Sequence, residues 1–286
     1  MNLLITGAWS DAKLHIAELE AMGNKVVFMQ QEKEELPCDG AWVEGVICNG
    51  LFLSHPFSEF PNLRYIQLTS AGYDRVDMAE VERRGIEIHN AKGVYSIPMA
   101  EFAVGGVLAL YKKLRLFAEK QKQHKWEKQR DLLELYGKTV CIVGCGDVGQ
   151  ECAKRFAAFG CKIVEVHRDL QNLDEWKAAD IVVVTIALTE QTRKLIKPTQ
   201  MKKGSVLVNI SRGAVVDEAD LVKALDGQLL GAVLDVFEEE PLALDSPLWD
   251  MENVIVTPHN SFVGDGDGER MRDRIRNNLE IKNEYA

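Results

Sequence analysis

Three ionisable side chains, Arg212, Glu240 and His259, each come shortly after a run of apolar, strand-like residues. An arginine is permanently charged, and its planar donors suit a carboxylate or a carbonyl oxygen. A histidine can hold or release a proton near neutral pH. A carboxylate beside that histidine would hold its tautomer and stabilise its charged form. This set of residue types suits the reduction of a 2-oxo acid.

A second candidate site is the stretch TVCIVGCGDVG, which places glycines at 144, 146 and 149 directly after an apolar run. Gly144 permits a tight turn, Gly146 lets a pyrophosphate approach the backbone, and Gly149 lets a helix pack closely on a strand. Asp147 and Val148 open the helix, where free N–H groups and the positive end of the dipole attract phosphate. The pattern predicts a dinucleotide cradle, and a simple strand–helix turn is the alternative.

The choice of dinucleotide depends on the end of the next strand. In NAD binders an acid about 20 residues after the loop takes the ribose hydroxyls. Here that place holds His167, followed by Arg168, which would attract a 2′-phosphate. NADP(H) is therefore favoured over NAD(H). Two alternatives stay open, because Glu165 could share a face with His167 and because His167 and Arg168 could simply be exposed to solvent.

The elements that must position these residues alternate between strands and helices, which predicts two parallel α/β units. In the first half, strand-like runs are expected at 2–7, 25–29, 45–49, 63–70 and 86–90. In the second half, runs rich in Val and Ile are expected at 139–144, 162–167, 181–186, 205–210, 231–237 and 253–258. Between the halves, the pattern predicts one long helix from about 97 to 126, apolar first and charged later. Such a helix could bridge two domains or form a dimer interface.

The composition bounds the function classes. The chain has 286 residues and a formal net charge of −10, which argues against nucleic acid or an anionic membrane as a partner. No apolar stretch is long enough to span a bilayer, and the N-terminus is expected to be a buried strand rather than a signal peptide. The six cysteines form no CxxC pair and accompany no histidine cluster. We therefore expect a reducing, cytoplasmic compartment and no metal site.

Several longer motifs occur together in one order. They are TSAGYDRVD (69–77), IPMAEFAV (97–104), VGCGDVGQ (143–150), ALTEQTRKLI (187–196), MKKGSVLVNISRGAVVDEADLVKAL (201–225), GAVLDVFEEEP (231–241) and NVIVTPHNS (253–261). With these motifs the chain resembles the D-isomer-specific 2-hydroxyacid dehydrogenase family over nearly its whole length.

The resemblance implies an oxidoreductase that transfers a hydride between NAD(P)H and C2 of a small 2-oxo acid. It implies that Arg212 orients the substrate, that Glu240 assists the histidine, and that His259 protonates the substrate oxygen. A non-catalytic, dinucleotide-sensing protein of the same fold is the alternative. The sequence does not identify the particular 2-hydroxy acid.

The same resemblance assigns further contacts. Asp235 is expected near the nicotinamide carboxamide. The loop Ser70, Ala71 and Gly72 is expected to bind the substrate carboxylate through backbone N–H groups.

The resemblance also implies two Rossmann-like parallel-sheet domains, with the cofactor domain inserted within a flavodoxin-like substrate domain. The substrate domain would comprise 1–96 and 263–286, and the NAD(P)-binding domain would comprise 97–262. A homodimer is expected, as is usual in the family. The short C-terminus leaves open whether the substrate domain is complete.

Overall fold

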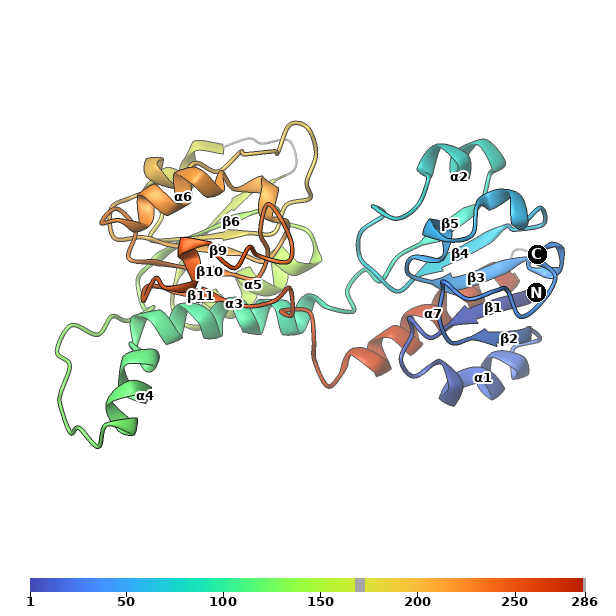
Figure 1. Cartoon of the computed structure of the whole chain (residues 1–286), viewed down its shortest axis with the longest axis horizontal. Coiled ribbons are helices and arrows are strands. Elements are labelled where there is room, and N and C mark those ends of the chain that lie inside the picture. The colour runs from blue at the N-terminus through green and yellow to red at the C-terminus, as the bar shows by residue number, and fades with distance from the viewer. Residues whose placement is uncertain (168–172, 285–286) are drawn as a thin grey trace. The chain divides into compact units, whose positions relative to one another are not determined.

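The computed structural model describes residues 1–167 and 173–284, so the predicted cofactor residue Arg168 lies outside the described residues. The chain divides into two compact units (Figure 1). One comprises Met1–Tyr95 and Gly264–Ala286, and the other comprises Ser96–Val263. Each unit is built on one parallel sheet. The predicted fold class, two parallel-sheet α/β domains, is confirmed.

The sheet of the first unit has the strand order β2-β1-β3-β4-β5, which is the flavodoxin-like order. Its strands are β1 (Asn2–Thr6), β2 (Lys25–Met29), β3 (Gly45–Cys48), β4 (Tyr65–Leu68) and β5 (Glu87–His89). Its helices are α1 (Ala12–Ala21), α2 (Met78–Arg84) and α7 (Asp267–Glu284).

The last helix, α7, completes the core of the first unit. Met271, Ile275 and Leu279 recur every four residues and therefore share one face of the helix. All three are buried in the same cluster as Leu3 and Ile5 of β1. Helix α7 thus packs on β1, the first strand of the sheet.

The sheet of the second unit has the order β11-β10-β9-β8-β6-β7. Its strands are β6 (Thr139–Val143), β7 (Lys162–Val166), β8 (Ile181–Val184), β9 (Val206–Asn209), β10 (Gly231–Leu234) and β11 (Val254–Val256). Its helices are α3 (Ser96–Tyr111), α4 (Leu114–Lys122), α5 (Asp147–Ala158) and α6 (Glu218–Leu225). After β7 the chain crosses to the other side of β6. Sheets with such a reversal generally bind ligands at this point, outside the carboxyl ends of the strands on either side, which here are β6 and β8.

The central strands are buried on both faces, as their continuous Val and Ile runs predict. Every residue of β8, β9 and β10 is buried. Helix α3 packs on α5 and against β9 and β10, and it contributes Ala100, Ala103 and Val107 to the core. The observed strands are shorter than several of the predicted runs, because the residues at their carboxyl ends turn into loops.

The prediction of one long helix over 97–126 is wrong. The helix ends at Tyr111, where Lys113 adopts a left-handed conformation with φ of 51°. The Leu133 N–H then donates to the Tyr111 carbonyl, and the Lys112 ammonium donates to the Leu133 carbonyl. The apolar half is held by packing on the sheet. The charged half buries no residue as α4, and it extends away from the sheet (Figure 1).

The described residues contain no helix with both the length and the apolar character needed to cross a bilayer. The six cysteines are all free thiols.

Candidate active site

The three predicted catalytic residues follow three neighbouring strands. Arg212 comes after β9, Glu240 after β10 and His259 after β11, and these strands are adjacent in the order β11-β10-β9. Because the strands are parallel, their carboxyl ends lie along the same edge of the sheet. The second unit therefore carries all three residues at one edge.

The structure brings Glu240 and His259 into direct contact. His259 Nδ1 lies 2.8 Å from Glu240 Oε2, and Glu240 Oε1 accepts a hydrogen bond of 3.1 Å from the Phe237 N–H. The carboxylate is thus anchored by one oxygen and orients the imidazole with the other. Among the described residues, Nε2 of His259 has no hydrogen-bond partner, and 41% of the side chain is exposed. This nitrogen can reach a small molecule.

The backbone of His259 is held in a strained conformation by a buried carboxylate. Its φ is 51°, a left-handed conformation that costs a residue other than glycine about 1–3 kcal/mol. The His259 N–H donates to the Asp235 carbonyl at 2.8 Å. The fully buried Asp235 carboxylate accepts from the Thr257 hydroxyl at 2.6 Å and from the N–H groups of Asn260 and Ser261 at 2.8 and 2.9 Å. Asp235 therefore positions the loop that carries His259, and its expected contact with the cofactor stays a prediction.

Sequence reasoning missed a buried asparagine that shapes the arginine loop. Asn209 Oδ1 accepts from the N–H and hydroxyl of Ser211, and its Nδ2 donates to the Arg212 carbonyl at 3.2 Å. The Arg212 guanidinium donates to the Ser211 carbonyl at 2.8 Å. A Cβ at Gly213 would lie 1.8 Å from the carbonyl carbon of Phe237, so only glycine allows this loop to pack against the next one. A polar residue ending the apolar run VLVN was the available signal.

The first acid of the run Glu238–Glu239–Glu240 has a structural role. Glu238 Oε1 lies 3.1 Å from Lys194 Nζ. The same oxygen accepts a hydrogen bond from the Glu218 N–H at the start of α6. In return, Glu218 accepts from the Glu238 N–H. Of the three acids, Glu240 contacts His259. Glu238 instead holds the start of α6, so its role is structural and not chemical.

The glycine loop between β6 and α5 has the form that a pyrophosphate needs. Gly144 has a φ of 103°, and a Cβ at Gly149 would lie 2.1 Å from the Gly144 carbonyl oxygen. Gly146 is the N-cap of α5, and a Cβ there would meet no atom within 4 Å. Asp147 and Val148 form the first turn of α5, where helix N–H groups lack intrahelical acceptors. These residues fit a dinucleotide phosphate, which could approach the backbone at Gly146.

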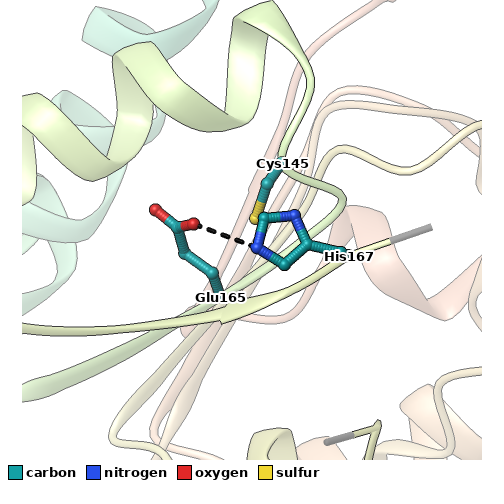
Figure 2. Close-up of side chains that lie close together, drawn as sticks. All are labelled: Cys145, Glu165 and His167. Atoms are coloured by element: carbon teal, nitrogen blue, oxygen red, sulfur yellow. Dashed lines mark ion pairs between the residues drawn. The ribbon is translucent and has the colours of Figure 1, made fainter. Parts of the chain in front are cut away.

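At the end of β7, His167 lies beside two other polar side chains (Figure 2). His167 Nε2 is 3.3 Å from Glu165 Oε2, and the Cys145 thiol lies next to both. Burial, followed by the charge of the Glu165 carboxylate, raises the pKa of Cys145 to about 11. The thiol is therefore protonated at neutral pH and is not an activated nucleophile. His167 stands where NAD binders have an acid. The structure pairs it with Glu165, the alternative candidate for contacting the ribose.

The predicted substrate loop belongs to the first unit and follows β4. The Ser70 hydroxyl donates to the Gly72 carbonyl at 3.0 Å, and the Asn90 amide donates to the Ala71 carbonyl at 2.6 Å. Ala71 is exposed. Both carbonyls thus accept hydrogen bonds from side chains, and the role of the loop in substrate binding remains a prediction.

The comparisons with known proteins agree on one group. Residues 104–261 match the family model described as D-isomer specific 2-hydroxyacid dehydrogenase, NAD binding domain. A glyoxylate/hydroxypyruvate reductase of Arabidopsis thaliana is 37% identical over 78% of this chain and 76% of its own.

Two solved structures resemble the whole chain. A D-lactate dehydrogenase of Aquifex aeolicus, complexed with NAD and lactic acid, has a TM-score of 0.80 at 25% identity and covers 99% of this chain and 96% of its own. An NADPH-dependent glyoxylate/hydroxypyruvate reductase of Sinorhizobium meliloti, complexed with NADP and malonate, has a TM-score of 0.78 at 27% identity, with 98% and 92% covered.

Proposed function

The chain belongs to the D-isomer specific 2-hydroxyacid dehydrogenase family, and from this premise we propose that it reduces a small 2-oxo acid to the D-2-hydroxy acid. The observation that carries the proposal is the 2.8 Å contact between His259 Nδ1 and Glu240, on the same sheet edge as Arg212. The cofactor is a nicotinamide dinucleotide, for which the glycine loop after β6 has the required form.

Each of the three residues has one task in the reaction. Arg212 binds and orients the substrate through its carboxylate or carbonyl oxygen, because its planar donors match such oxygens in pairs. His259 releases a proton from Nε2 to the substrate oxygen as that oxygen becomes a hydroxyl. Glu240 accepts from Nδ1, which fixes the ring and stabilises its charged form before the proton leaves. The bound nicotinamide supplies the hydride that C2 receives.

The remaining assignments follow from the same proposal. The unit containing Met1–Tyr95 would bind the substrate, with the Ser70–Gly72 loop donating N–H groups to its carboxylate. The unit Ser96–Val263 would bind the dinucleotide, with Asp235 near the carboxamide. A homodimer and a cytoplasmic location stay predictions. Leu114 at the start of α4 and Trp126 after its end are both exposed. These apolar side chains support the prediction that a second copy of the chain covers this surface.

The test is a substrate panel. Purified protein is mixed with glyoxylate, hydroxypyruvate or pyruvate and with NADH or NADPH, and oxidation of the reduced cofactor is followed by absorbance. We expect turnover with at least one of the three acids, and chiral chromatography of the pyruvate product should give D-lactate. Dinucleotide binding without turnover across a broad 2-oxo acid panel would instead support a sensing protein.

We further propose that NADPH is preferred, because His167 stands where an acid would repel a 2′-phosphate. His167→Asp should shift the ratio of kcat/KM for NADPH over NADH toward NADH by about 10- to 100-fold. This range corresponds to one lost hydrogen bond to a charged group, about 1.5–3 kcal/mol. Both kcat/KM values are measured at one fixed salt concentration, because the effect is electrostatic.

Two variants make the His167 result interpretable. His124→Asp introduces the same charge at an exposed histidine of the same unit and should leave the ratio unchanged. Glu165→Gln tests the rival acid. If Glu165 holds the ribose hydroxyls, this variant weakens NADH. An unaltered ratio in His167→Asp, together with weaker NADH binding in Glu165→Gln, would assign the choice to Glu165.

A further inference from the structure

Three potential metal ligands of different chemical type meet where the glycine loop lies next to the end of β7. Cys145 Sγ, a carboxylate oxygen of Glu165 and a ring nitrogen of His167 all lie within 4.8 Å of one another (Figure 2). The cysteine belongs to the loop after β6, and the other two residues belong to β7 and its end. No spacing motif in the sequence connects Cys145 with the pair.

The pairing of β6 with β7 brings the three side chains together. Val143 is in register with Val166, and the Gly144 N–H donates to the Val166 carbonyl at 2.8 Å. The residues that follow on the two strands are therefore side by side. Glu165 and His167 are two positions apart and so point to the same face of the sheet.

The separations suit a single ion. Two nitrogen or oxygen ligands at about 2.0–2.1 Å from a tetrahedral zinc ion lie about 3.3–3.4 Å apart. His167 Nε2 and Glu165 Oε2 are 3.3 Å apart. The sulfur is weakly fixed, at 3.7 and 3.8 Å from the carbonyls of Ile142 and Val166, and a small side-chain rotation would bring it to the ion.

The donor types select the class of ion. The ion would displace the proton of the Cys145 thiol into solvent and bind the resulting thiolate. A thiolate with an imidazole suits zinc and similar borderline-soft cations, whereas magnesium and calcium prefer oxygen ligands alone. Glu165 and His167 keep 41% and 61% of their side chains exposed, so an ion can enter from solvent. Three protein ligands leave a fourth position for water or another small ligand.

From this geometry we infer that Cys145, Glu165 and His167 bind a zinc-class divalent cation, and that this cation and the dinucleotide exclude one another. The inference of the metal site depends only on the positions of the three side chains. The exclusion rests on the proposed function, because it requires the adenosine end of the dinucleotide to contact the end of β7. Zinc would then lower activity by competing with the cofactor and not with the 2-oxo acid.

Direct metal binding tests the site without any assay of activity. Co²⁺ is titrated into the full chain free of dinucleotide, and Zn²⁺ then displaces it, with a parallel Zn²⁺ titration by calorimetry. We expect one ion per chain and a thiolate-to-cobalt charge-transfer band in the near ultraviolet. Cys145→Ser should abolish the band, and Glu165→Gln and His167→Gln should each weaken Zn²⁺ binding at least about tenfold.

The chain offers matched controls. His89 Nε2 lies 2.6 Å from Glu87 with the same two-residue spacing, and Cys161 is another half-buried thiol. His89→Gln and Cys161→Ser should bind zinc as the wild type does. Equal Zn²⁺ binding by Cys145→Ser and wild type would overturn the site, and thermal unfolding of each variant verifies that it is folded.

Adding NADPH or NADH tests the exclusion. The apparent Kd for Zn²⁺ should rise with dinucleotide concentration, and the Kd for dinucleotide should rise with Zn²⁺ to the same extent. Zinc binding at Cys145 that the bound dinucleotide leaves unchanged would overturn the exclusion. If the metal-free protein binds no dinucleotide, the proposed function fails, while the Cys145→Ser titration still decides the metal site.

Discussion

His259→Asn is expected to lower kcat for reduction of the 2-oxo acid by about 10²- to 10⁴-fold, the usual contribution of a positioned general acid. The asparagine cannot release a proton to the substrate oxygen. Its small polar side chain also tolerates the left-handed backbone that this position requires, so the loop should keep its conformation. The measurement is steady-state kinetics on the best substrate of the panel, together with dinucleotide binding, which should change little.

His124→Asn is the matched control for this variant. His124 is exposed and has a φ of 55°, close to the 51° of His259, so the backbone demands are the same at both positions. We expect the control to retain wild-type kcat. Glu240→Gln should fall between the two, since it keeps a hydrogen-bond acceptor for the ring but removes the charge that stabilises the imidazolium. A wild-type rate for His259→Asn would exclude His259 as the proton donor.

Arg212→Lys is expected to lower kcat/KM for the 2-oxo acid by about 100-fold. The lysine keeps the positive charge but cannot donate two parallel hydrogen bonds. Losing one hydrogen bond to a charged group costs about 3 kcal/mol at the upper end, which is about two powers of ten in rate. The loss should fall on the substrate, with the KM for the dinucleotide within about twofold of wild type.

Arg212→Lys should leave the conformation of its loop unchanged, so it tests the chemistry of the side chain and not the folding of the loop. The contacts that shape the loop come from Asn209 to the backbone and side chain of Ser211 and to the Arg212 carbonyl, and a lysine leaves them intact. Arg193→Lys, at an exposed arginine of the same unit, serves as the control. Equal kcat/KM values for Arg212→Lys and wild type would mean that this arginine does not orient the substrate.

The incorrect long-helix prediction shows what local sequence patterns do not predict, namely the break between α3 and α4. The charged sequence after Tyr111 has good intrinsic helix formers, and α4 is indeed helical. The break between α3 and α4 depends on Leu133, which returns from further along the chain to satisfy the Tyr111 carbonyl. No residue near position 111 carries that information.

The sequence alone determined the two α/β units, the strand-ending positions of Arg212, Glu240 and His259, and the glycine loop. These features depend on hydrophobic periodicity, on glycine conformation and on motifs, which are properties of neighbouring residues. The comparisons confirm the family resemblance. The sequence alone could predict it because the family's motifs are contiguous stretches.

Only the tertiary structure decided which side chains touch. Glu240 and His259 are 19 residues apart, and the order β11-β10-β9 brings the carboxylate to the ring. The motif places Asp235 near the cofactor, which stays a prediction, and only folding shows that its buried carboxylate accepts three hydrogen bonds from the His259 loop. Cys145 meets Glu165 and His167 through strand register alone. Such contacts arise from the free energy of packing whole elements together, which no local segment of the chain contains.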